Sequence, residues 1–147
     1  MRLVVQRVNK ASVKIVDKNI VSGSINQGLF VLVGIGKSDN KEKAKILAEK
    51  LAKLRILSDE NGKMNLSLYD THQELLVVSQ FTLYADTTAG NRPSFIKAAE
   101  PELAKEIYDY FLVCLKDLGL KVETGEFGAY MQINSELDGP VTIILEE

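Results

Sequence analysis

The sequence of 147 residues contains no tryptophan, a single cysteine and a single histidine. One cysteine excludes an internal disulfide, and one cysteine with one histidine leaves no ligand set for a Cys/His metal site. Only three prolines are present, they are scattered, and no repeat or linker is visible. We therefore predict one domain over residues 1–147, with no metal and no other cofactor.

An excess of positive charge is also missing, because 18 Lys and Arg face 20 Asp and Glu. A protein that holds long nucleic acid through many phosphates needs dense basic residues, so this class is disfavoured. The most apolar stretch, 29–35, is too short to cross a bilayer. The first residues lack the apolar region and cleavage site of a signal peptide. We expect a cytoplasmic protein without a membrane partner.

Apolar periodicity predicts a mixed α/β (α+β) fold, with a largely antiparallel sheet and two covering helices. Helical spacing marks residues 40–54 and 101–118, with Asp39 as the expected N-cap of the first helix and Pro101 in the first turn of the second. Strands are expected near residues 3–8, 11–15, 20–25, 28–36, 55–57, 74–84, 121–123, 130–134 and 141–145.

Three isolated features favour ordinary structural roles. Gly36-Lys37-Ser38 resembles the end of a phosphate-binding loop, but the required earlier glycine is replaced by Val31, so a polar loop is favoured. His72 lies in a polar loop over residues 69–73, and a Ser-His-Asp triad would have to use it. Cys114 lies on the apolar side of the second helix and is interpreted as a core residue and not a nucleophile.

Polar residues interrupt the buried strand at Ser79, Gln80 and Thr82, next to Phe81. In an extended strand Ser79 and Phe81 share one face, and Gln80 and Thr82 share the other. Buried polar groups need partners, so two interpretations stay open. The strand either leaves the core here, or its end lines a pocket with hydroxyl, amide and backbone N–H groups.

Two glycine-containing segments near the end of the chain have similar alternatives. Residues 125–131 form either a simple bend or a close-approach wall beside a flat ligand, with Phe127 or Met131 packing against it. Gly139-Pro140 precedes a strand and is typical of a turn. A rigid Gly-Pro turn also presents two carbonyls without a side chain to screen them.

Taken together, the motifs resemble the D-aminoacyl-tRNA deacylase family, also called D-tyrosyl-tRNA deacylase, over the whole chain. One departure is Leu137, which stands where the family usually has Asn directly before Asp-Gly-Pro. The matching segments are QRV with ASV (6–8, 11–13), GKMN (62–65), VVSQFTL (77–83), RPSF (92–95), YDYF (108–111), FGAYM (127–131) and DGPVT (138–142).

This resemblance implies an enzyme that hydrolyses the ester joining a D-amino acid to the 3′-terminal adenosine of tRNA, and that also accepts glycine. It implies a barrel-like core and a homodimer in which Gly139 and cis-Pro140 act in the partner's site. Their carbonyls would exclude an L side chain, so chirality is proofread by rejection. Arg7 matches an arginine that supports this loop.

The resemblance also assigns the remaining site residues. Gln80 and Thr82 are the candidate catalytic residues, with Thr82 either a nucleophile or a positioning group for a reaction in which the terminal ribose 2′-OH activates water. An unassisted hydroxyl is a poor nucleophile, which favours positioning. Backbone N–H groups of residues 79–82 would stabilise the oxyanion. The expected substrate-binding residues are Ser79, Phe81, Phe127, Ala129 and Met131.

Two other functions remain as alternatives to this hydrolase. One is a non-catalytic module that binds an RNA end or a nucleotide, and the other is a conventional Ser/His hydrolase that uses His72. The acidic composition is compatible with an enzyme that holds only a tRNA end. A few cations would then steer the acceptor stem, with Lys10, Lys14, Arg92 and Lys97 as candidates.

Overall fold

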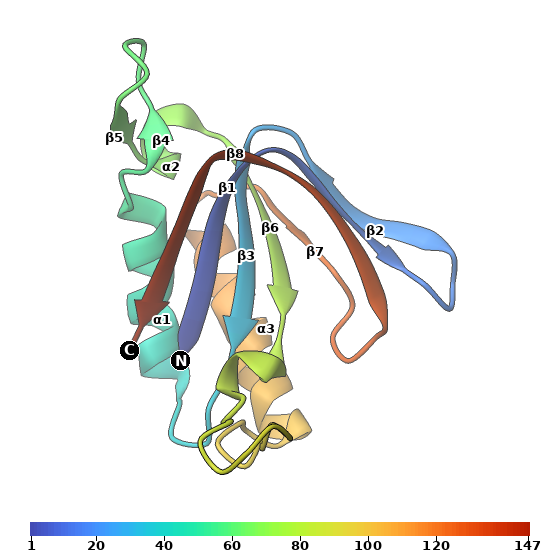
Figure 1. Cartoon of the computed structure of the whole chain (residues 1–147). Coiled ribbons are helices and arrows are strands. Elements are labelled where there is room, and N and C mark those ends of the chain that lie inside the picture. The colour runs from blue at the N-terminus through green and yellow to red at the C-terminus, as the bar shows by residue number, and fades with distance from the viewer.

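β1 (Arg2–Ile15) is the central strand of the protein, and the computed structural model, which describes residues 1–147, shows it as one continuous element (Figure 1). Two shorter strands were expected here, separated at Asn9-Lys10. Register shifts between Gln6 and Lys10 in the pairing with β8 (Met131–Glu146) absorb this interruption without ending the strand. Bulges of this kind bend a strand and increase its twist. β1 therefore curves from one part of the sheet into another.

The main sheet has the order β2-β1-β3-β6-β7, and β8 pairs with the other edge of β1. The strands β2 (Ile20–Ile25), β3 (Gly28–Gly34) and β8 run antiparallel to β1, whereas β3, β6 (Glu74–Ser79) and β7 (Val122–Thr124) are mutually parallel. Ser22 on β2 donates a hydrogen bond to the carbonyl of Thr124 on β7, at 3.2 Å. This contact brings the two ends of the path together, so the sheet forms the expected barrel-like core.

Strands β3 and β6 are apolar throughout because both of their faces are buried. Leu29, Val31 and Val77 belong to a large core between the sheet and the helices. Phe30 and Leu76 belong to a smaller core on the other face, inside the barrel. Alternate residues of one strand point to opposite faces, so an uninterrupted apolar run is required here.

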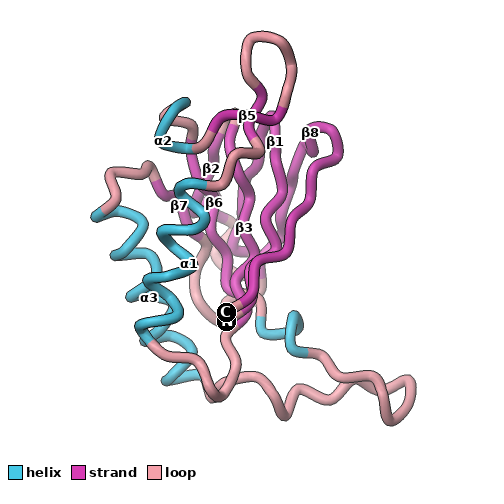
Figure 2. The backbone as a smooth tube through the Cα atoms, turned by 90° about the vertical axis from the view of Figure 1, so that its left-hand side faces the viewer, coloured by secondary structure: helices cyan, strands magenta, loops and turns pink.

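Helices α1 (Lys41–Lys53) and α3 (Pro101–Asp117) cover one face of the sheet, as expected (Figure 2). The expected N-cap of α1 is wrong by one residue, because the Asn40 side chain accepts the Lys43 N–H and Asp39 is buried instead. A short third helix, α2 (Leu68–Thr71), occupies part of the expected polar loop. None of the helices is both long and apolar enough to cross a membrane.

The strand expected over residues 74–84 ends at Ser79. After Gln80 the chain turns into a short 3₁₀ helix, η1 (Phe81–Tyr84). The polar run therefore does not alternate across a strand. By contrast, the expected strands at 130–134 and 141–145 are parts of the single strand β8, which contains the cis Gly139–Pro140 bond. The remaining strands are β4 (Leu57–Ser58) and β5 (Met64–Leu66), which form a separate two-stranded sheet.

Candidate active site

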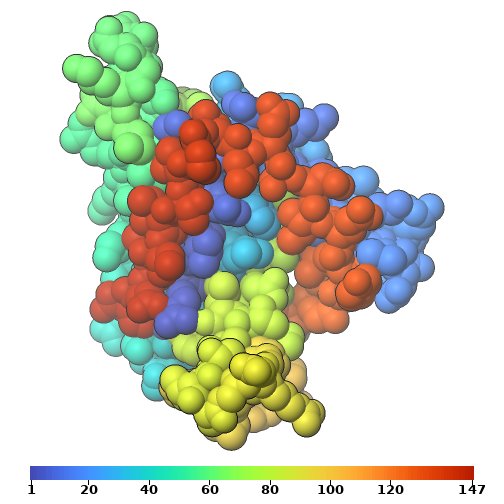
Figure 3. All heavy atoms as spheres, viewed as in Figure 1, coloured from blue at the N-terminus to red at the C-terminus, as the bar shows by residue number.

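A cavity of about 740 Å³ lies where β3 and β6 end. Figure 3 shows its setting, with the yellow-green segment of η1 facing the orange-red start of β8 across a hollow. Most lining side chains are apolar, and no histidine, lysine or aspartate is among them. The only charged lining residue is the exposed Glu100, the N-cap of α3. The cavity is thus an apolar site with few polar groups, as small-molecule sites usually are.

One wall is the end of β6 and the start of η1. Ser79, Gln80 and Phe81 line the cavity, and the Gln80 side-chain amide donates a hydrogen bond to the Thr82 hydroxyl. The Gln80 N–H is already bonded to the Val33 carbonyl at 2.8 Å. The N–H groups of Phe81 and Thr82 begin the 3₁₀ helix and have no acceptor within it. Phe81 lines the cavity, whereas Thr82 is adjacent to it in sequence and is not among the lining residues.

The opposite wall is the segment between β7 and β8. Phe127, Ala129 and Met131 line the cavity, which brings them together with the β6 end as the sequence motifs predict. The Phe127 ring packs on Tyr108 of α3, with ring centroids 5.8 Å apart. Gly125 lies so close to Met131 that a Cβ there would be 2.5 Å from its sulfur. The same Cβ would lie 3.5 Å from Val13 Cγ2, so Gly125 lets this wall approach β1 closely.

Sequence reasoning did not assign several lining residues of the cavity. Phe95 contacts the exposed Phe81 ring edge-on, with centroids 5.0 Å apart. Its presence in the RPSF motif was the available signal. Ala98, Ala99 and Ala104 line the cavity near the start of α3, and Tyr130 lines it with 74% of its surface exposed. Alanines carry no local signal for a site, because they are equally typical of any helix or core.

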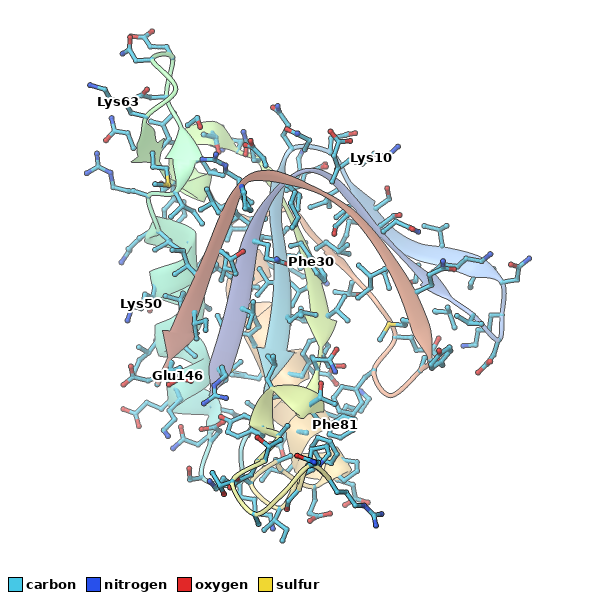
Figure 4. The ribbon with its side chains drawn as sticks, in the orientation of Figure 1. Lys10, Phe30, Lys50, Lys63, Phe81 and Glu146 are labelled. Carbon is cyan, nitrogen blue, oxygen red and sulfur yellow. The ribbon has the colours of Figure 1, made fainter.

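The Gly139-Pro140 loop does not line this cavity. Arg7, which contacts the loop, pairs with Leu29 on β3, whereas the cavity begins at Val33. Four residues of strand separate these levels by about 13 Å. Within one chain the two sets of predicted site residues are therefore apart. Figure 4 labels Phe81 at the lower end of the sheet, where the cavity lies, and Lys10 at its upper end.

Arg7 binds the residue directly before the loop. Its Nε lies 2.7 Å from Asp138 Oδ2, an ionic contact whose angle does not satisfy a hydrogen bond. Its Nη1 donates to the Ile56 carbonyl at 2.9 Å and to the Ser58 hydroxyl at 3.2 Å. The Arg7 side chain thus links Asp138 to Ile56 and Ser58, at and next to β4.

Other candidates lie outside the cavity. His72 is the C-cap of α2, in the left-handed conformation with φ 54°. Cys114 is half-buried on α3 and packs against the large core. Lys97, a candidate for steering tRNA, forms an ion pair with Asp86 at 2.8 Å. Hydrogen bonds from Lys97 and Thr88 hold the pKa of Asp86 well below its usual range.

Comparison with known proteins gives one family. The family described as D-Tyr-tRNA(Tyr) deacylase matches residues 4–146. A protein of Thermosipho africanus named D-aminoacyl-tRNA deacylase is 56% identical, over 99% of this chain and 97% of its own. A protein of the same name from Clostridium botulinum is 58% identical with the same coverage.

Two solved structures share the fold. One, described as c-Myc DNA Unwinding Element Binding Protein, is 40% identical with a TM-score of 0.92 and covers 100% of this chain and 99% of its own. The other is described as a probable eukaryotic D-amino acid tRNA deacylase. It is 15% identical with a TM-score of 0.86, covers 98% of this chain and 97% of its own, and shows the likeness of fold alone.

Proposed function

The chain belongs to the D-Tyr-tRNA(Tyr) deacylase family and its activity is the deacylation of D-aminoacyl-tRNA, and we propose how its residues divide this work. The substrate is the ester between a D-amino acid, or glycine, and the 3′-terminal adenosine of tRNA. Water cleaves the acyl C–O bond, which releases the free amino acid and the ribose hydroxyl. Because this substrate takes part in translation, the proposed location of the protein is the cytoplasm.

The apolar cavity at the end of β6, next to the start of η1, carries this proposal. Phe127, Ala129 and Met131 form an apolar wall suited to adenine, opposite the end of β6. The N–H groups of Phe81 and Thr82 have no acceptor within the 3₁₀ helix, and in this proposal they bind the oxyanion. Ser79 and Phe81 hold the aminoacyl group next to these N–H groups.

Thr82 positions the substrate in this proposal and does not attack it. A hydroxyl nucleophile needs a neighbouring base, and no histidine, lysine or aspartate lines the cavity. The Gln80 amide donates to the Thr82 oxygen, so the Thr82 proton remains free to bond the substrate. The ribose 2′-OH of the substrate then activates the attacking water.

The chiral gate requires a second copy of the chain. Gly139 and Pro140 are exposed and lie about 13 Å along the sheet from their own cavity, so a homodimer supplies them in trans. Their carbonyls face the Cα of the amino acid and leave no room for an L side chain. Glycine has no side chain to exclude and is also hydrolysed. This mechanism selects by rejection and not by reading the D side chain.

Release of amino acid from D-tyrosyl-tRNA and L-tyrosyl-tRNA tests the proposal. We expect release from the D form only. Binding of both tRNAs without release would instead identify a module that binds an RNA end. Activity that survives in His72→Ala excludes the Ser/His hydrolase, and its loss in a folded protein would overturn our assignment.

A further inference from the structure

We propose that Asp39 and Tyr84 are positioning residues that brace η1 from outside the cavity and thereby aim the Phe81 and Thr82 N–H groups at the substrate. This inference rests on the proposed role of those N–H groups. Neither Asp39 nor Tyr84 lines the cavity.

Asp39 is a buried carboxylate whose oxygens are all used. Its side chain is 2% exposed, and Oδ1 accepts from the Met1 amino group at 2.6 Å and from Lys43 at 3.3 Å. Oδ2 accepts the Gly36 N–H at 2.6 Å and the Tyr84 hydroxyl at 3.1 Å. Burial alone raises the pKa of Asp39, but the Met1 amino group and the Gly36 N–H outweigh it and hold that pKa below its usual value. A buried charge persists only when it is paired in this way.

Tyr84 connects this carboxylate to η1, because its hydroxyl donates to Asp39. It is the last residue of η1, and its ring lies directly on Gly36, where a Cβ would approach ring atom Cε1 to 2.8 Å. The Arg2 guanidinium covers the ring, 5.3 Å from the centroid, and also bonds the Leu83 carbonyl. Tyr84 is therefore held by packing on Gly36, by a cation–π contact with Arg2 and by a partly buried hydrogen bond to Asp39.

η1 depends on this brace because it has no buried residue of its own. Its other end is tied through Gln80, whose N–H bonds the Val33 carbonyl at 2.8 Å. Within the turn, the Ala85 N–H bonds the Thr82 carbonyl at 3.0 Å. A displacement at Tyr84 therefore passes directly to Phe81 and Thr82, and a misplacement of about 1 Å in a site can cost about 100-fold in rate.

Tyr84→Phe tests the brace, since it removes only the hydroxyl that bonds Asp39. We expect kcat for D-tyrosyl-tRNA to fall about tenfold with KM changed by less than about twofold, because binding surfaces are untouched. The Leu83 and Ala85 amides donate to the Gln80 and Thr82 carbonyls and are therefore protected, so their hydrogen exchange should become faster in the same variant.

Tyr108→Phe is the matched control. Its buried hydroxyl donates to the Val77 carbonyl of the same sheet at 2.9 Å, and the ring that packs on Phe127 is kept. Its kcat should stay within about twofold of the unchanged protein. A purely structural role for Asp39 and Tyr84 predicts equal kcat in both variants, which would overturn the brace.

The exchange measurement separates this inference from the proposed function. If the unchanged protein released no amino acid, the proposed function would be wrong, and the brace would still be tested by exchange of the Leu83 and Ala85 amides. Unchanged exchange of these amides in folded Tyr84→Phe would refute the brace whatever the activity. Asp39→Asn provides a second variant and should repeat the kcat loss if Tyr84→Phe acts through Asp39.

Discussion

Arg7 and Asp138 form an ion pair, with 2.7 Å between Nε and Oδ2, at the residue directly before Gly139. The Arg7 side chain is 12% exposed and Asp138 is 40% exposed, so the pair is partly screened by water. Leu137, which stands in place of the family's usual Asn, is 44% exposed. In this chain the contact that ties the loop to the sheet thus runs through the neighbouring Asp138.

Asp138→Ala should change the selectivity of the Gly-Pro loop while it lowers the free energy of unfolding only slightly. A partly exposed ion pair contributes about 1 kcal/mol or less, so the loss of unfolding free energy should be of that size. Release from L-tyrosyl-tRNA should rise relative to the D form. Lys105→Ala, which removes the surface pair between Lys105 and Asp109, is the control. Equal D/L ratios in both variants would contradict the role of Asp138.

Gly139→Ala should weaken the rejection of L substrates. Gly139 has φ of 117°, and a Cβ there would lie 2.8 Å from Val141 Cγ2, so the loop must move. We expect release from L-tyrosyl-tRNA to appear while D release continues. Gly119→Ala is the control, because Gly119 also has positive φ, 78°, with no atom near its Cβ position. L release in the control as well would assign the effect to general destabilisation.

Mixed dimers test whether the loop acts in trans. A chain carrying both Gln80→Ala and Gly139→Ala has an inactive cavity and a defective loop. Co-refolded with the unchanged chain, it should create release from L-tyrosyl-tRNA, because an intact cavity then receives a defective loop from its partner. Mixing in Gln80→Ala alone should create none. If the double variant also creates none although sedimentation detects mixed dimers, the loop acts in its own chain.

Thr82 variants separate positioning from nucleophilic attack. If Thr82 only positions the substrate, Thr82→Ala should lower kcat by about 10- to 100-fold, and Thr82→Ser should retain most of it. A nucleophile would instead form an acyl-enzyme. Rapid quenching of the unchanged protein followed by mass spectrometry should find no aminoacyl adduct, and an adduct on Thr82 would refute positioning.

Acid should destabilise the fold through Asp39. Because the pKa of Asp39 is lowered on folding, its ionised form adds stability above its unfolded value of about 3.8, and this stability is lost as the pH falls through the folded pKa. The melting temperature should therefore fall as the pH is lowered below about 4. Asp39→Asn should have a lower melting temperature than the unchanged protein at pH 6, and its melting temperature should fall less as the pH is lowered. If the melting temperatures of both proteins fall equally with pH, Asp39 is not the cause of the acid destabilisation.

Much of the secondary structure follows from local pattern. The helices at 41–53 and 101–117 and the strands β2 and β3 follow from periodicity, because burial on one or both faces dictates where apolar residues stand. The end of β6 did not follow. The polar residues Ser79, Gln80 and Thr82 left open whether the strand leaves the core here. They did not predict the 3₁₀ turn, whose residues Leu83 and Tyr84 contact Gly36, Asp39 and Arg2 from distant parts of the chain.

The site divides in the same way. The family motifs proposed Gln80, Thr82, Phe127, Met131 and the Gly139-Pro140 pair as site residues from residue order alone. Which of them share a cavity depends on how β1 and β8 pair, and that pairing joins residues more than a hundred positions apart. Local sequence does not encode such distances. Only the folded sheet brings Phe127 and Met131 to the end of β6 while it leaves Gly139 and Pro140 about 13 Å away, because long-range strand pairing fixes both positions.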